Sequence, residues 1–142
     1  MIGMVCRVRV RLKCGEREVD AVALLSSGFE SDAPDIAVPI SVAERLGLWP
    51  PREGEEAETA ILETGGGDVA VVYYEDVAEL QLIIEDRPPK VVRIGVLVNP
   101  HLDEVLISDY VASELGVILL DFREGLWRLK DDPPDKVRES VR

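Results

Sequence analysis

The N-terminal part of the chain alternates between apolar and charged residues with the period of a β-strand. From residue 4 to 13, apolar residues occupy every second position from Met4 to Leu12, and from residue 7 onward basic residues alternate with them. Since successive side chains of a strand point to opposite faces, this pattern predicts a strand with one buried face. A turn at 14–17 and a second strand at 18–25, which becomes apolar on both faces, complete a hairpin whose second arm enters the core.

Shorter patterns predict the remaining elements. Ser41 and Glu44 have the spacing of a capping box, so a helix is expected to begin there and to end at Gly47 in the left-handed conformation. A second helix is expected at 109–115, just before Gly116. Further strands are expected at 36–39, 58–63, 69–74, 76–85, 90–98, 106–108, 118–121 and 126–129. About nine or ten short strands and two short helices predict a mainly β chain that forms a closed or sandwich-like barrel.

Length and composition favour a single domain. With 142 residues, of which 46% are hydrophobic, the chain is long enough for one core and too short for two comfortable ones. We place the domain at residues 1–130 and expect 131–142, which are charged and contain Pro133 and Pro134, to form a mobile tail. Asn99 and Gln81 are the only amides among many charged residues, a composition typical of heat-adapted proteins, so a thermophilic source is expected.

The charge and the apolar runs of the chain limit its expected partners. A formal net charge of -12 opposes binding to nucleic acid and to anionic membranes, and the four basic residues between 7 and 13 are explained as the solvent face of a strand. No apolar run approaches the ~20 residues that span a bilayer, so a soluble, cytoplasmic protein is expected. Cys6 and Cys14 would lie roughly 26 Å apart along one strand, too far for a disulfide. With a single histidine in the chain, a structural metal site is not expected.

The most informative motif follows the second strand. Apolar residues from Val22 to Leu25 lead directly into Ser26, Ser27 and Gly28. This resembles the retropepsin-like aspartic protease family, in which two hydrophobic residues precede Asp-Thr/Ser-Gly, with Ser26 standing where the family has its aspartate. The order of the later motifs is similar as well. A glycine-tipped hairpin at 63–73 corresponds to the flap of the family, and an apolar segment precedes the second helix, with Ser108 where the family usually has a glycine.

The resemblance implies a closed retropepsin-like β-barrel with a flap hairpin and two short helices, and a homodimer whose subunits form one cleft. In the family, two aspartates share a proton and activate water. A serine hydroxyl with no base beside it cannot take either role. We therefore expect an inactive homologue that needs no cofactor and binds a peptide or protein segment in the cleft. The expected site comprises the turn Ser26, Ser27 and Gly28 and, as binding residues, Glu30, Asp32, Gly65, Gly66, Gly67 and Tyr73.

Other readings of the same residues stay open. The chain could be an active aspartic endopeptidase that uses the nearby acids Glu30 or Asp32, although the turn aims only its first side chain at the cleft, or one in which Ser26 is not the native residue. It could also be a structural dimerisation module that kept the barrel and lost the chemistry. A serine hydrolase that pairs Ser26 with His101 is disfavoured, because Ser26 does not lie in a Gly-x-Ser-x-Gly turn. For Tyr73, packing in the sheet is the alternative to a place in the cleft.

Overall fold

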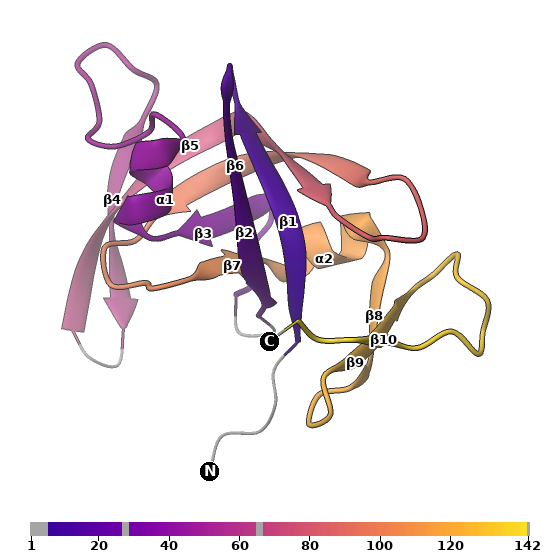
Figure 1. Ribbon diagram of the computed structural model, residues 1–142. Coiled ribbons are helices and arrows are strands. Elements are labelled where there is room, and N and C mark those ends of the chain that lie inside the picture. Colours follow the sequence, from indigo (N-terminus) through magenta and orange to yellow (C-terminus); the bar gives the residue numbers. More distant parts are fainter. Residues whose placement is uncertain (1–5, 27–28, 65–66, 142) are drawn as a thin grey trace.

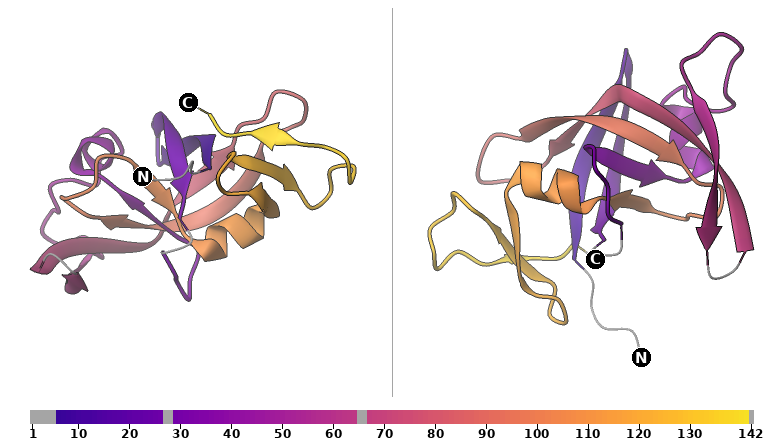
Figure 2. Two further views of the ribbon diagram at one scale, coloured as in Figure 1. Left: turned by 90° about the horizontal axis from the view of Figure 1, so that it is seen from below. Right: turned by 180° about the vertical axis from the view of Figure 1, so that it is seen from behind.

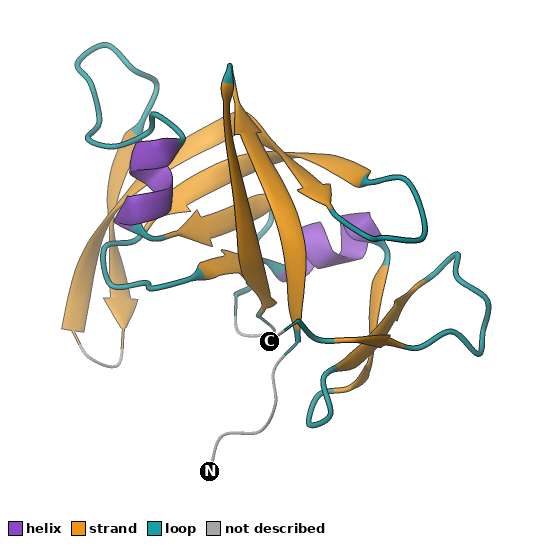
Figure 3. Ribbon diagram, viewed as in Figure 1, coloured by secondary structure: helices purple, strands orange, loops and turns teal. Residues whose placement is uncertain are grey.

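The chain folds into a mainly β structure, and a computed structural model describes its residues 6–26, 29–64 and 67–141. Within these ranges there are ten strands and two helices (Figure 1, Figure 3). The strands are β1 (Arg7–Cys14), β2 (Arg17–Leu25), β3 (Asp35–Val38), β4 (Glu58–Thr64), β5 (Gly67–Leu82), β6 (Lys90–Val98), β7 (Val105–Ile107), β8 (Val117–Asp121), β9 (Leu126–Leu129) and β10 (Arg138–Glu139). The helices are α1 (Ile40–Arg45) and α2 (Asp109–Leu115).

Six of the strands close into a barrel. They follow one another in the order β1-β2-β7-β3-β6-β5, and residues 10–13 of β1 pair with residues 79–82 of β5 to close the ring. Among the described strands, β4 pairs only with β5 and continues the sheet beyond the ring. The prediction of a mainly β chain with a closed barrel and two short helices is therefore confirmed.

The first hairpin has the register and the burial that the alternating pattern predicts. Strands β1 and β2 pair antiparallel from Arg7 opposite Leu24 to Cys14 opposite Arg17. Val8, Val10 and Leu12 are at most 1% exposed. Burial of these alternate side chains supplies the apolar contacts that hold the hairpin in the barrel. Cys6 and Cys14 are both free.

Strand β5 differs from the prediction of two separate strands at 69–74 and 76–85. It runs without a break from Gly67 to Leu82, and its pairing with β6 shifts between Tyr74 and Ala78. Asp76 within this irregularity has a positive φ of 42°. Such a bulge bends a strand and increases its twist, and here it lets one strand serve both the outlying hairpin with β4 and the barrel wall.

The two helices begin in different ways. Helix α1 starts at Ile40 after Pro39, and no side chain caps it, so the predicted capping box at Ser41 is wrong: Ser41 already lies inside the first turn. Helix α2 covers the predicted residues 109–115. Ser108 caps it by accepting from the backbone N–H of Val111 (3.3 Å), and Gly116 follows with a left-handed φ of 77°. Neither described helix, of six and seven residues, has the length to cross a membrane.

A small second sheet lies beside the barrel, on the side away from the β4–β5 hairpin (Figure 1, Figure 2). Its order is β10-β9-β8. The residues after 130, for which the sequence predicts a charged tail, contribute β10 and then return to the barrel, where the Val141 N–H donates to the Arg7 carbonyl (2.9 Å). Asp132 in this segment is only 8% exposed.

Candidate functional site

Ser26 lies at the end of β2, where the chain leaves the barrel. Strand β2 runs parallel to β7, with Leu25 opposite Ile107. The Ser26 N–H continues this ladder by donating to the Ile107 carbonyl (3.2 Å), and the Ser26 carbonyl accepts from the Phe29 N–H (3.2 Å). The Ser26 main chain therefore forms hydrogen bonds through both its N–H and its carbonyl group. Ser27 and Gly28, the other predicted members of the turn, lie outside the described residues.

The segment after the turn is fastened to the start of α2. The Asp109 N–H donates to the Phe29 carbonyl (3.1 Å), and the Asp109 carboxylate accepts from the Ser31 N–H (3.1 Å). The Ser108 N–H reaches the Asp35 carbonyl (3.4 Å). Ser26 and residues 29–35 are thus joined to residues 107–109, which are far away in the sequence.

A hollow of about 240 Å³ adjoins Ser26, and we call it the Ser26 hollow. Leu25, Val117 and Leu119 contribute apolar walls, and Ser26 and Lys130 are among its polar lining residues. The single histidine, His101, is exposed and does not line it. The structure therefore does not pair Ser26 with His101, the base that a Ser–His hydrolase would need.

The predicted acids near the turn face solvent. Glu30 and Asp32 are both exposed, and neither lines the Ser26 hollow. Ser31 between them is half-buried, and its hydroxyl turns inward to donate to an Asp35 carboxylate oxygen (2.6 Å). The loop after the turn therefore presents Glu30 and Asp32 outward, whereas Phe29 and Ser31 bond inward to Asp109 and Asp35.

Asp35, the first residue of β3, is a half-buried acid beside this loop that the sequence did not single out. Its second carboxylate oxygen accepts from the Tyr73 hydroxyl (2.6 Å), and Gly95 packs directly against both groups. We call Ser31, Asp35, Tyr73 and Gly95 the Asp35 cluster. Burial, followed by the hydrogen bond to Asp35, raises the pKa of the Tyr73 phenol well above its usual value. One signal could have found Asp35: it is an acid immediately before the apolar strand that begins at Ile36.

The hairpin of β4 and β5 extends away from the barrel. Glu58 pairs with Tyr73 at its base and Thr64 pairs with Gly67 near its end. Gly65 and Gly66 lie outside the described residues, whereas Gly67 has a φ of 113° that favours glycine. The hairpin and the end of β2 point toward the same side of the molecule, the lower side in Figure 1. Tyr73 belongs to the base of this hairpin, not to its tip.

A second, acidic hollow of about 570 Å³ lies at the base of the hairpin, beside Tyr73. The carboxylates of Glu56, Glu58, Glu75 and Asp76 line it, and Arg93 pairs with Asp76 (3.0 Å). Among the described residues no group of three or more His, Cys, Asp and Glu side chains is arranged to hold a metal ion. The excess of negative charge makes this surface unfavourable for anions.

The fold is a closed β-barrel in which the segment after Ser26 is hydrogen-bonded to the start of the short helix α2. No model of a known protein family matches the chain, and no curated protein matches it. Its function must therefore be argued from the site itself.

Proposed function

We propose that the protein is a catalytically inactive homologue of retropepsin-like aspartic proteases, and that it forms a homodimer whose cleft binds a peptide or protein segment. The observation that carries the proposal is the position of Ser26, at the end of β2, bonded to Ile107 of β7 and beside the start of α2. This is the position that the resemblance assigns to the catalytic aspartate of the family.

The chemistry of position 26 argues for binding without catalysis. An aspartic protease needs two carboxylates that share one proton, so that one acts as base and the other as acid. Ser26 has a hydroxyl, which neither takes a proton from water nor shares one near neutral pH. Glu30 and Asp32, the acids of the alternative endopeptidase reading, face solvent in the next loop. A pair of subunits would thus bring two hydroxyls together instead of two acids.

Apolar surface near Ser26 supports pairing of two copies. Val117 and Leu119 of β8 line the Ser26 hollow, and Leu120 and Phe122 close by are 45% and 55% exposed. Among the described strands, β8 pairs only with β9, so its other edge is open to a further strand. A two-fold pair buries the same patch on both copies, which makes an apolar, open-edged surface beside the turn a suitable interface.

The outlying hairpin supports the peptide-binding part of the proposal. Strand β4 is an edge strand, and its Ile61 is 67% exposed. Extended peptides bind readily to exposed strand edges, where main-chain hydrogen bonds supply affinity and side-chain pockets supply specificity. A hairpin on the same side of the barrel as the Ser26 turn would place such an edge over a shared cleft.

A cleavage assay tests the catalytic part. The wild type and Ser26→Asp are incubated with casein at acid pH, with and without pepstatin. We expect no cleavage by the wild type and pepstatin-sensitive cleavage by Ser26→Asp. Cleavage by the wild type, lost in Glu30→Gln or Asp32→Asn, would instead establish the endopeptidase reading.

The mass in solution and a peptide screen test the binding part. We expect a dimer at micromolar concentration, and a monomer for Leu119→Asp, which places a charge in the Ser26 hollow. Val91→Asp is the matched control, because Val91 is 52% exposed on β6 and does not line the hollow. A monomeric wild type would contradict the homodimer. A dimer that retains no peptide from a pooled library would favour the structural dimerisation module.

A further inference from the structure

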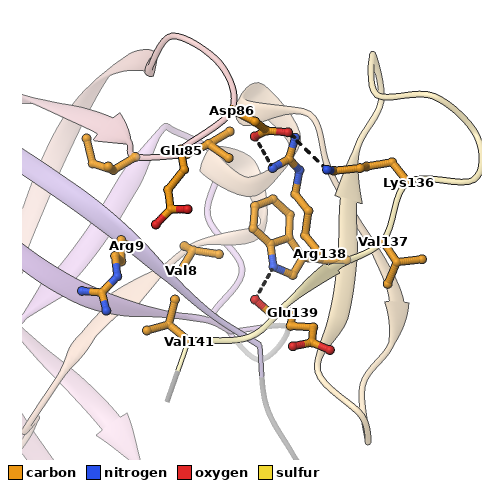
Figure 4. A pocket seen from close by; sticks show the side chains of 12 residues that line it. Val8, Arg9, Glu85, Asp86, Lys136, Val137, Arg138, Glu139 and Val141 are labelled. Carbon is orange, nitrogen blue, oxygen red and sulfur yellow. Dashed lines mark hydrogen bonds and ion pairs between the residues drawn. The ribbon is translucent and has the colours of Figure 1, made fainter.

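A second pocket lies where the barrel meets the three-stranded sheet. It measures about 400 Å³, and we call it the junction pocket (Figure 4). Two main-chain contacts border it. The Val141 N–H donates to the Arg7 carbonyl (2.9 Å), and the Ile83 N–H donates to the Arg9 carbonyl (3.0 Å). Val8, which lies between Arg7 and Arg9 on β1, is one of the residues that line the pocket. Ligand pockets commonly form at such junctions and have volumes of about 300–1,000 Å³.

One wall of the junction pocket consists of charges that already have partners. The Arg138 guanidinium donates to Asp86 (2.8 Å) and to Asp132 (2.9 Å), and Lys136 pairs with Asp86 (3.2 Å). Only 9% of the Arg138 side chain is exposed. Figure 4 shows the ion pairs of Asp86 with Arg138 and Lys136 in the upper right of the view. Since their charges are satisfied within the protein, they form a rigid wall with little demand for an ionic ligand.

The floor of the junction pocket is apolar. Val8 and Trp127 are only 1% and 5% exposed, so the apolar surface that a ligand can reach comes from Ile83, Ile84 and Val141, which are half-buried. The Trp127 indole N–H donates to the Glu139 carbonyl (3.4 Å), and Arg138 lies over its ring at 5.7 Å. The indole is therefore fixed in place, and Val137, at 52% exposed, adds apolar surface at the rim. Such a surface favours an apolar body in the ligand.

The other rim carries two opposite charges without partners. Arg9 and Glu85 are both exposed, and neither side chain forms a hydrogen bond or an ion pair with any residue in the described part of the chain. Figure 4 places both on the left of the view, away from Arg138. A free guanidinium can bind a carboxylate in a bidentate manner, and a free carboxylate can accept from an ammonium group.

We propose that the junction pocket binds a small zwitterion with an apolar body, of the class of the hydrophobic α-amino acids. The ligand carboxylate contacts Arg9, its ammonium contacts Glu85, and its side chain lies against the accessible apolar residues Ile84 and Val141. The combination of an apolar floor with one unpaired charge of each sign is what such a molecule matches. The site shares no lining residue with the Ser26 hollow, so the inference does not depend on the proposed function.

Titration calorimetry with L-phenylalanine tests this inference. NMR spectra follow the indole N–H signal of Trp127 in parallel, and the variant Trp49→Phe identifies which of the two tryptophan signals it is. We expect saturable binding that shifts this signal. Loss of one charge-assisted contact costs about tenfold in affinity, so Arg9→Gln and Glu85→Gln should each weaken binding by about that factor. Both side chains are exposed, and unchanged spectra elsewhere verify the fold. Arg123→Gln and Glu53→Gln, which alter exposed charges outside the pocket, are the controls and should bind as the wild type does.

Two related compounds separate the roles of the charges. Phenethylamine lacks the carboxylate and 3-phenylpropionate lacks the ammonium, so each should bind about tenfold more weakly than L-phenylalanine. Three results would overturn the inference: no heat and no shift of the Trp127 signal at millimolar ligand, binding that Arg9→Gln and Glu85→Gln leave unchanged, or equal binding of all three compounds. None of these results bears on dimerisation or on peptide binding, which other residues carry.

Discussion

Gly95→Ala tests whether the Asp35 cluster is an energetically coupled unit, because it adds one methyl group beside the Tyr73–Asp35 hydrogen bond. It lies on β6 opposite Asp35 of β3. A Cβ atom at Gly95 would stand 2.7 Å from the Tyr73 hydroxyl and 3.1 Å from Tyr73 Cε1, and still closer to Asp35 Oδ1. The Tyr73 hydroxyl and Asp35 Oδ1 are the two atoms that the Tyr73–Asp35 hydrogen bond joins. The methyl group of Gly95→Ala therefore cannot be accommodated while that bond keeps its geometry.

The expected cost follows from what has to move. Both obstructing groups are the ends of side chains, which rotate more easily than the backbone shifts, so the substitution should part the hydrogen bond rather than distort the sheet. A hydrogen bond to a charged group contributes about 1.5–3 kcal/mol, and overpacking alone costs about 1–3 kcal/mol. Since Tyr73 and Asp35 are only half-buried and water can replace part of the bond, we expect Gly95→Ala to lower the free energy of unfolding by about 2 kcal/mol.

A double-mutant cycle separates the hydrogen bond from crowding. Tyr73→Phe removes the hydroxyl and should cost about 1.5 kcal/mol by itself. In the double variant the methyl group meets no hydroxyl and no bond remains to be broken. Its cost should therefore be about 2–2.5 kcal/mol instead of the sum of about 3.5 kcal/mol, a coupling of about 1 kcal/mol or more.

Urea unfolding followed by tryptophan fluorescence measures all four free energies at one pH. Tyr110→Phe is the matched control for the loss of a phenol hydroxyl, because Tyr110 is 37% exposed, its hydroxyl forms no hydrogen bond within the described residues, and the change should cost less than about 0.5 kcal/mol. Strictly additive costs, or a Gly95→Ala variant as stable as the wild type, would refute the cluster as a coupled unit.

Two further predictions concern the C-terminal segment and the helix starts. Hydrogen bonds from Arg138 lower the pKa of Asp132 and hold that of Asp86 at about 2, below the unfolded value of about 3.9. Their contribution is therefore present above about pH 4 and is lost as the pH falls toward 2, so thermal melts should show a smaller loss in this window for Arg138→Gln than for the wild type. Ser108→Ala removes the cap of α2 and should lower the free energy of unfolding by about 1 kcal/mol. Ser41→Ala should lower it by less than about 0.5 kcal/mol, because no side chain caps α1. Equal costs in urea unfolding would contradict this assignment of caps.

Elements with strong local patterns could be predicted from the sequence. The alternation from Cys6 to Leu12 predicted β1 and its buried face, because period-two burial is a property of each strand by itself. Helix α2 was also predicted, since Gly116 marks its end through local backbone geometry.

Features that depend on tertiary contacts escaped prediction. Glu75 and Asp76 interrupt the apolar pattern and suggested a break between strands, whereas a bulge absorbs them in one continuous β5. The capping box at Ser41 has the right spacing, but the N-cap position of α1 is Pro39, two residues earlier. The Asp35 cluster joins residues 38 positions apart in the sequence through Tyr73, and no local pattern could pair them.

The way in which Ser26 is held determines how the cleavage assay can be interpreted. Its turn is held by main-chain groups: the Ser26 N–H bonds to Ile107 and its carbonyl accepts from Phe29. The neighbouring contacts of Asp109 with Phe29 and Ser31 do not involve the Ser26 side chain either. Ser26→Asp should therefore fold, because it changes none of these bonds. If the variant folds and dimerises but does not cleave casein, the missing activity is explained by the geometry of the paired acids or of the cleft, not by the stability of the turn. That result would favour a barrel whose peptide site has diverged beyond the loss of one carboxylate.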